Sequence, residues 1–222
     1  MNIRSSTIII TLILSFAALS YSADQKPDFR QVSWGMSKDE VKKNEKAEMV
    51  KETDSILVYL IKGGPKHQII HTQPDLDGKS MELSIDIDVP DYNLVYLFPE
   101  GKLGMAILHM DNPKADPDDY LDEFDRQADE ITEQTGKEPK GMAKYGENET
   151  EDAIYAHPER ICSGIYAVKL IWADVSDRTN IMMELDSRKD AQDKSECTLS
   201  IFYDSVKFPV DPASSAKMHE VL

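Results

Sequence analysis

The sequence lacks the short motifs that usually identify an enzyme. It contains no Gly-x-Ser-x-Gly nucleophile elbow, no glycine-rich phosphate-binding loop, no His-Glu-x-x-His zinc motif and no four-cysteine pattern. Pairs of carboxylates are plentiful, but their spacing singles none of them out. We therefore predict no catalytic residue, no cofactor and no metal site, and expect a protein that is not an enzyme.

Long hydrophobic runs are also missing, with one exception at the N-terminus. Arg4 precedes an apolar run from Ile8 to Leu19, and small residues follow as far as Ala23. The run is shorter than the roughly 20 residues that a membrane-spanning helix needs, and the pattern is typical of a secretory signal peptide. We predict that residues 1–23 are a signal peptide and that the mature chain is secreted or periplasmic, the alternative being an uncleaved anchor.

Cysteine is scarce, because only Cys162 and Cys197 are present. Neither lies near the predicted cleavage region, which excludes lipid attachment there and a stable membrane anchor after cleavage. Export exposes thiols to an oxidising compartment, where an even number of cysteines is usually paired. We expect a Cys162–Cys197 disulfide, which contributes about 4 kcal/mol in the chain-entropy model.

Positive charge is in deficit. The chain has 25 Lys and Arg residues against 41 Asp and Glu residues, a net charge of −16. Residues 1–23 hold one basic residue, Arg4, and no acidic one, so the mature charge is 24 minus 41, or −17. Such a surface repels nucleic acid and anionic lipid and attracts cationic partners or dissolved cations. The expected partner is therefore another protein, with a cationic one favoured, and not nucleic acid.

The first half of the mature chain is predicted to be a helix followed by strands. Ser37 and Glu40 form a capping box that predicts a helix over 38–46. Strands are predicted over 55–62, 67–72, 81–89, 94–98 and 103–110, and in 81–89 apolar and polar residues alternate strictly. The sequence Pro99-Glu100-Gly101-Lys102 predicts a hairpin turn between the last two strands.

The second half repeats this order. A helix is predicted from Asp116 to Gly136, with Pro117 at its first position and one apolar stripe formed by Leu121, Phe124, Ala128 and Ile131. Strands are predicted over about 152–157, 165–173, 179–186 and 196–204. The fold class is therefore α+β, with two consecutive α-β-β-β-β units at 24–112 and 113–208 that can form one continuous curved sheet. Residues 209–222 are predicted to be a flexible tail.

One segment carries a family resemblance. The run Phe29-Arg30-x-Val32-x-Trp34-Gly35-Met36-Ser37-x-x-Glu40-Val41 resembles the opening of a broad group of small exported bacterial proteins of uncharacterised function. The doubled α-β-β-β-β order is also similar to the fold of beta-lactamase-inhibitory proteins. That second resemblance implies a concave sheet face that binds another protein, although it depends on element order alone.

Two short patterns resemble metal sites but fit them poorly. His67 and His71 are predicted on a strand, where both point to one face about 13 Å apart, too far to share one ion. The sequence Asp75-Leu76-Asp77-Gly78 resembles the start of a calcium loop, but the glutamate that should stand twelfth is absent. We interpret the first pattern as surface histidines and the second as a turn.

The most plausible function from the sequence is a soluble, exported, non-enzymatic binding module that acts on another protein or an envelope component. Two alternatives remain open: a cation-binding envelope protein that uses Asp75, Asp77 and the acidic run from Asp116, and a hydrolase with a dispersed carboxylate site. In that acidic run the residues beyond the first helical turn, Glu123 among them, are predicted to face solvent. Residues predicted to contact a partner are Tyr92, Tyr96, Asp118, Asp119 and Asp122.

Overall fold

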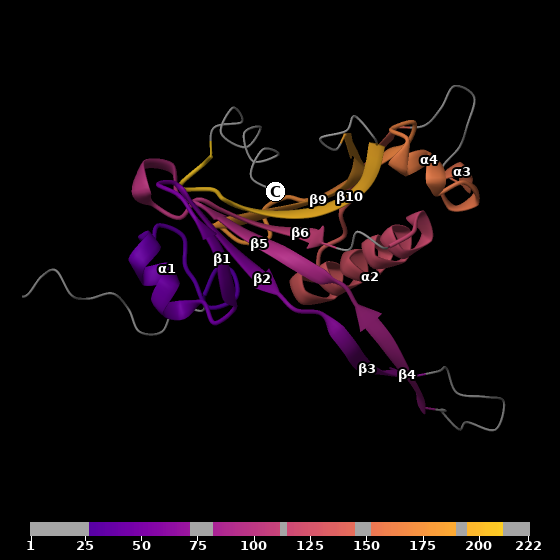
Figure 1. Cartoon of the computed structure of the whole chain (residues 1–222), viewed down its shortest axis with the longest axis horizontal. Coiled ribbons are helices and arrows are strands. Elements are labelled where there is room, and N and C mark those ends of the chain that lie inside the picture. The colour runs from indigo at the N-terminus through magenta and orange to yellow at the C-terminus, as the bar shows by residue number, and fades with distance from the viewer. Residues whose placement is uncertain (1–26, 72–81, 112–114, 145–151, 190–194, 211–222) are drawn as a thin grey trace, which may run out of the picture.

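The fold is α+β, built on one curved antiparallel sheet of eight strands that does not close into a barrel (Figure 1). It is described from a computed structural model. The structure describes residues 27–71, 82–111, 115–144, 152–189 and 195–210. The predicted signal peptide, residues 75–78 and the tail from residue 211 lie outside these ranges.

The elements alternate between helices and groups of strands. The described helices are α1 (Lys38–Asn44), α2 (Pro117–Thr135), α3 (Asp152–Ala156) and α4 (Glu159–Cys162), with a 3₁₀ turn η1 (Pro99–Gly101). The strands of the first half are β1 (Glu48–Glu52), β2 (Ile56–Ile61), β3 (Gly64–His71), β4 (Glu82–Val89), β5 (Asp91–Leu97) and β6 (Met105–Asp111). Those of the second half are β7 (Lys140–Lys144), β8 (Ala167–Trp172), β9 (Thr179–Lys189) and β10 (Ser195–Ser205).

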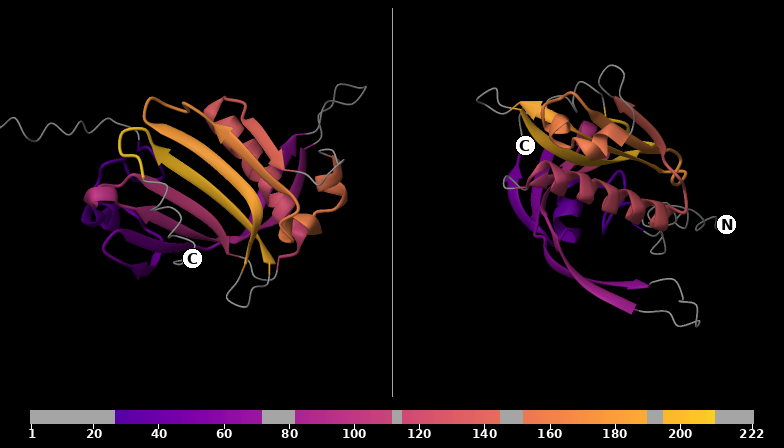
Figure 2. Two further views of the ribbon diagram at one scale, coloured as in Figure 1. Left: turned by 90° about the horizontal axis from the view of Figure 1, so that it is seen from above. Right: turned by 90° about the vertical axis from the view of Figure 1, so that its right-hand side faces the viewer.

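The strand order shows two similar units joined edge to edge. The main sheet runs β1-β2-β5-β6-β10-β9-β8-β7, so each unit supplies four neighbouring strands in mirrored order and the units meet where β6 pairs with β10. Strands β3 and β4 form a separate hairpin that extends beyond the main sheet (Figures 1 and 2). The predicted α+β fold class with one continuous curved sheet is confirmed. The second unit departs from the predicted order, because α3 and α4 stand between β7 and β8.

Short local sequence signals explain where helices α1 and α2 begin. In α1 the Ser37 backbone N–H donates to Glu40 Oε2 at 2.8 Å, and the Glu40 N–H donates back to Ser37 Oγ, which confirms the capping box. In α2 the same reciprocal pair forms between Asp116 and Asp119. The helix ends at Gly136, whose φ of 64° is the left-handed conformation that glycine adopts without strain.

Each helix closes a core of its own on the same face of the sheet. Strand register places Tyr96, Ala106, Tyr203 and Ile181 in one cross-strand row on this face. The first core joins α1 and the segment before it to β2, β5 and β6; its buried residues are Phe29, Val32, Trp34, Val41, Leu57, Tyr59, Leu94, Tyr96, Phe98, Leu103 and Ala106. The second core joins the apolar stripe of α2 to β8, β9 and β10.

Two strands of the sheet were not predicted, and one segment was assigned the wrong type. Strands β1 and β7 were not predicted, because both lie at the edges of the sheet and carry no alternating apolar residues; every residue of β1 is exposed. The segment near 152–157 was predicted as a strand but forms α3, a helix too short to display a helical period.

The predicted disulfide is present. Cys162 ends α4, Cys197 lies in β10, and their Cα atoms are 4.2 Å apart. The bond therefore fixes α4 against the sheet next to the second core, which includes Cys197 and packs against Cys162.

Candidate functional site

The two cores leave a gap between them, and this gap is the candidate site. Ile61, Leu108 and Tyr203 pack against both cores, yet each remains only partly buried. They belong to β2, β6 and β10, so they lie across the junction of the two units. A cavity of about 1040 Å³ opens above them. The sheet therefore presents an apolar floor that neither helix covers.

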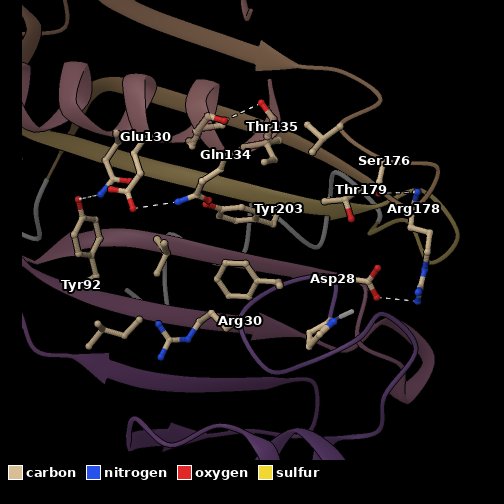
Figure 3. Close-up of a pocket in the computed structure, with 18 of the residues that line it drawn as sticks. Asp28, Arg30, Tyr92, Glu130, Gln134, Thr135, Ser176, Arg178, Thr179 and Tyr203 are labelled. Carbon is tan, nitrogen blue, oxygen red and sulfur yellow. Dashed lines mark hydrogen bonds and ion pairs between the residues drawn. The ribbon is translucent and has the colours of Figure 1, made fainter. Parts of the chain in front are cut away.

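Three segments distant in sequence wall the cavity (Figure 3). Residues 27–30 form one side, the turn between β8 and β9 closes one end at residues 175–179, and α2 forms the opposite side with Arg126, Gln127, Glu130 and Gln134. The α2 residues are spaced so that they follow one flank of the helix beside its apolar stripe. The cavity thus combines an apolar floor with polar walls.

Tyr203 stands in the middle of the floor (Figure 3). Its ring packs against Phe29 with the ring centres 4.4 Å apart. Burial, assisted by the negative charge of Glu130, raises the pKa of Tyr203 to about 12. Its hydroxyl lines the cavity and makes no hydrogen bond to any other described residue. The ring is therefore held in place while its hydroxyl is left without an acceptor.

Arg30 lies on the wall formed by residues 27–30. Its φ of 50° is uncommon for a residue with a side chain and occurs in a tight turn closed by the bridge between Phe29 and Val32. Its guanidinium donates from Nε to Glu45 Oε2 at 3.1 Å and from Nη2 to Glu45 Oε1 at 3.3 Å. Backbone conformations of this kind are often retained at functional sites.

Glu45 is the buried anchor of Arg30. Besides the guanidinium, it accepts hydrogen bonds from the Tyr96 hydroxyl at 2.7 Å and from the backbone N–H of Ala47. Burial acts to raise the pKa of Glu45, but these hydrogen bonds outweigh it and hold the pKa below its usual range. Tyr96 itself has its pKa raised by burial and by Glu45.

Asp28 and Arg178 close the end of the cavity next to the β8–β9 turn (Figure 3). Asp28 Oδ2 accepts from Arg178 Nη2 at 2.8 Å and from the Trp34 backbone N–H at 2.9 Å. Burial raises the pKa of Asp28, and the nearby charge of Asp177 acts in the same direction. The Trp34 indole N–H also donates to Thr179 Oγ1 at 2.9 Å, which ties the N-terminal segment to β9.

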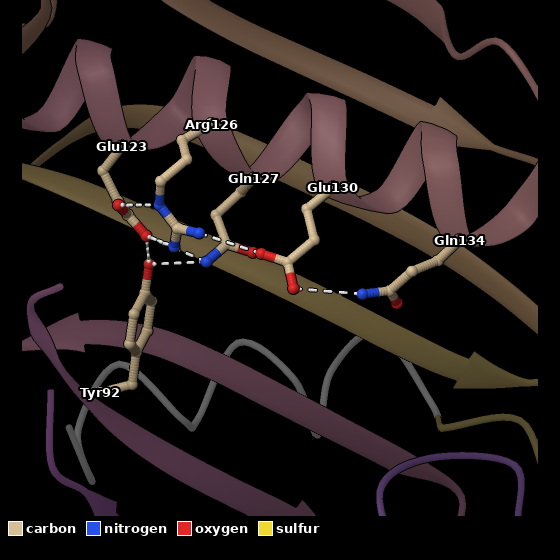
Figure 4. Close-up of polar contacts among 6 residues, drawn as sticks. All are labelled: Tyr92, Glu123, Arg126, Gln127, Glu130 and Gln134. Atoms are coloured by element: carbon tan, nitrogen blue, oxygen red, sulfur yellow. Dashed lines mark hydrogen bonds and ion pairs between the residues drawn. The ribbon is translucent and has the colours of Figure 1, made fainter. Parts of the chain in front are cut away.

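A cluster of polar side chains marks the other end of the cavity (Figure 4). Glu123 of α2 is buried and accepts from the Tyr92 hydroxyl, from Gln127 Nε2 at 2.9 Å and from two nitrogens of Arg126, with Nε at 2.7 Å. Arg126 Nη1 also donates to Glu130 Oε2 at 2.9 Å. Burial opposes ionisation of Glu123, but the hydrogen bonds from Arg126, Tyr92 and Gln127 hold its pKa below the usual range.

The charges on the cavity lining balance. Three of the lining side chains are cationic and three are anionic: Arg30, Arg126 and Arg178 against Asp28, Glu130 and Asp177. Every one of the three guanidiniums forms an ion pair with a carboxylate. The lining side chains alone are therefore balanced, and the partner carboxylates Glu45 and Glu123 stand behind them.

The predicted partner-contact residues are not brought together. Tyr92 lines the cavity but is buried, and Tyr96 is completely buried with its hydroxyl on Glu45, so neither is exposed as a contact on the outer surface would be. Asp118, Asp119 and Asp122 are exposed on the first turns of α2, and none of them lines the cavity. Asp119 serves the helix cap.

One residue of the acidic run in α2, Glu123, does not lie where it was predicted. Glu123 was predicted on the solvent side of the helix, but it points inward because Arg126, Tyr92 and Gln127 satisfy its oxygens there. His67 and His71 lie on strand β3, as predicted. Asp75 and Asp77 lie outside the described residues.

The residues of the cavity that sequence reasoning missed are Asp28, Arg30, Glu130, Arg178 and Tyr203. No motif links them, since they come from the N-terminal segment, α2, the β8–β9 turn and β10. The one available signal was α2, where polar residues spaced by four positions run beside the apolar stripe.

Within the described ranges, no group of three or more His, Cys, Asp or Glu side chains is arranged to hold a metal ion. None of the helices in the described part of the chain is long and apolar enough to cross a membrane. Comparison of the chain with protein-family models, with curated proteins and with solved structures gives no match.

Proposed function

We propose that the mature chain is a soluble, exported binding protein without catalytic activity, and that it takes an amphipathic component of the cell envelope into the cavity between its two cores. The observation that carries this proposal is the apolar floor at Ile61, Leu108 and Tyr203, which stays partly exposed in a cavity of about 1040 Å³. Ligand sites in proteins are typically concave, about 300–1,000 Å³ in volume and largely apolar, with a few polar groups that fix orientation.

The polar walls support a binding role in preference to a catalytic one. Glu130 accepts hydrogen bonds from Arg126 and Gln134, and Glu123 is saturated by its neighbours. Carboxylates held in this way orient side chains and stabilise the walls, but they have little capacity left for proton transfer. These contacts keep the walls in place without a ligand.

A hydrolase with a dispersed carboxylate site is the second candidate, and one observation favours it. Asp28 of the N-terminal segment and Asp177 of the β8–β9 turn line the same end of the cavity, and the pKa of Asp28 is raised. Perturbed carboxylates in clefts are candidate acid–base groups. Hydrolysis of a simple ester or glycoside that the D28N variant loses would establish this candidate and overturn the binding proposal.

The binding proposal is tested by titrating the mature protein into N-phenyl-1-naphthylamine, an uncharged dye that fluoresces in apolar surroundings. We expect saturable binding at one site. Val175 lines the cavity, and Val175→Trp places a large side chain there. We expect this variant to weaken dye binding by about tenfold or more, the equivalent of about 1.4 kcal/mol.

The matched control is Val50→Trp. Val50 is an exposed residue of β1 that does not line the cavity, so this variant should bind the dye as the parent protein does. Thermal unfolding of both variants checks that they fold. Absence of saturable dye binding, or equal binding by the two tryptophan variants, would overturn the proposal.

A further inference from the structure

The charged groups around the cavity are already paired with one another, and this pairing restricts the ligand. Arg30 is paired with Glu45, and Arg178 with Asp28. Arg126 is paired on one side with Glu123 and on the other with Glu130. The lining carboxylate outside these pairs, Asp177, is exposed at the β8–β9 turn. A ligand head that reaches Tyr203 therefore meets side-chain charges that are already paired.

A charged ligand head is disfavoured under these conditions. It would lose water on entry, and burial of an ion is costly unless an opposite charge is available to pair with it. To obtain such a partner, an anionic head would have to displace a carboxylate from a guanidinium, and a cationic head would have to displace a guanidinium. The net charge of −16 adds a repulsive field against anions.

An uncharged polar group, in contrast, finds a partner in the cavity. The Tyr203 hydroxyl lines the cavity without a hydrogen bond to another described residue. Its pKa is raised to about 12, so it keeps its proton at neutral pH and can donate it to an acceptor. An ether, ester or hydroxyl oxygen would fill this role without bringing a charge.

We propose that the cavity binds an uncharged amphipathic molecule, whose apolar body lies along Phe29, Ile61 and Leu108 and whose oxygen-bearing head accepts a hydrogen bond from the Tyr203 hydroxyl. This inference rests on the proposed binding function and specifies its ligand class. A neutral lipid such as a monoacylglycerol has the required chemistry.

The test is displacement of N-phenyl-1-naphthylamine from the mature protein by three competitors that share one alkyl chain. Monolauroyl glycerol is uncharged, laurate is anionic and laurylamine is cationic at neutral pH. All are used below the concentrations at which they form micelles. We expect monolauroyl glycerol to displace the dye at a concentration about tenfold lower than either charged competitor, because only it avoids burying an unpaired ion. Its affinity should not change with salt concentration.

Two tyrosine variants test the role of the hydroxyl. Tyr203→Phe removes the proposed donor. We expect it to lower the affinity for monolauroyl glycerol about 3- to 10-fold, the effect of losing one neutral hydrogen bond. Tyr59→Phe is the matched control. Tyr59 is buried on the same face of the sheet, its hydroxyl has no partner among the described residues, and it does not line the cavity. It should bind as the parent protein does.

The outcomes separate the two proposals. If laurate or laurylamine displaces the dye as well as monolauroyl glycerol does, the ligand class is wrong and the binding function stands. If Tyr203→Phe binds monolauroyl glycerol as tightly as Tyr59→Phe does, the assigned donor is wrong. If the dye itself does not bind, the proposed function fails and this inference fails with it.

Discussion

The Glu123→Gln variant provides the most demanding test of how the cavity wall is held together. Glu123 is 6% exposed and accepts four hydrogen bonds, two of them from the guanidinium of Arg126. Glutamine has nearly the same size, but it carries no charge and replaces one acceptor oxygen with an NH₂ group. At least one donor among Arg126, Tyr92 and Gln127 must then lose its acceptor.

The magnitude follows from the burial of the two partners. Removing one member of a buried ion pair costs about 3–5 kcal/mol, and a single hydrogen bond to a charged group contributes about 1.5–3 kcal/mol. Because the Arg126 side chain is 21% exposed, water screens part of the interaction and the low end applies. We expect a loss of about 2–3 kcal/mol at pH 7. For a chain of this size this lowers Tm by about 4–12 °C.

The pH dependence has a defined sign. The pKa of Glu123 in the folded protein is lowered, whereas an unfolded glutamate titrates near about 4.3. The folded state therefore binds fewer protons than the unfolded state. The stabilisation that ionised Glu123 gives to the fold is complete above about pH 5, and it is lost as the pH falls through the pKa of Glu123 in the folded protein. The difference in unfolding free energy between the parent protein and E123Q should narrow as the pH falls below about 4.

The assay is urea unfolding followed by tryptophan fluorescence, repeated from pH 7 downwards. Glu130→Gln is the matched control, because Glu130 pairs with the same guanidinium but its side chain is 40% exposed. Exposed ion pairs contribute about 0–1 kcal/mol, so E130Q should cost less than about 1 kcal/mol. The reasoning is refuted if E123Q and E130Q are equally destabilised at pH 7, or if the E123Q difference does not narrow in acid.

Three further changes test other parts of the fold. Replacing Cys162 and Cys197 together with serine should lower the unfolding free energy by about 2–4 kcal/mol, measured as a lower urea midpoint, and a reductant should then no longer affect stability. Thr179→Val leaves the buried indole N–H of Trp34 without its acceptor and should cost about 1–3 kcal/mol; an unchanged Tm would contradict this role. Ser37→Ala removes the α1 cap and should cost about 1 kcal/mol in urea unfolding, whereas Ser37→Asp, which can still cap, should cost less.

The helices that begin with a local signal were predictable from the sequence. A capping box is contained in four consecutive residues, and the start of α1 at Ser37 follows from them alone. The apolar stripe of α2 likewise depends only on spacing within the helix, and Leu121, Phe124 and Ile131 are all buried as predicted. The central strands were predictable because they are rich in apolar residues, and β5 is buried on both faces, with Leu94 in one cluster and Val95 in another.

The edge strands were not predictable in this way. Strand β1 pairs with the sheet on one side only, and its Met49 and Val50 are exposed. Without a buried face there is no alternation to read, since the alternation of a strand records which side is covered. The same limit applies to α3, where five residues are too few to separate a helical period from an alternating one.

The buried polar residues around the candidate site could not be predicted from the sequence for a different reason. Tyr92 and Glu123 are 31 positions apart, Tyr96 and Glu45 are 51 apart, and Trp34 and Thr179 are 145 apart. A tyrosine or glutamate is predicted to be exposed because burial without a partner is costly. These residues are buried because the fold supplies hydrogen-bond partners for them. A local sequence pattern cannot predict a partner that lies tens of residues away in the sequence.

The position of the cavity follows from the way the two units are joined. Each unit covers its own part of the sheet with its own helix, and the units meet at β6 and β10, where neither helix covers Leu108 or Tyr203. Side chains at the two ends of this gap join the units to each other, as Asp28 does with Arg178 and Tyr92 does with Glu123. The walls therefore hold their shape without a ligand, so a ligand that fits need not supply the free energy to order them, and less of its binding energy is lost.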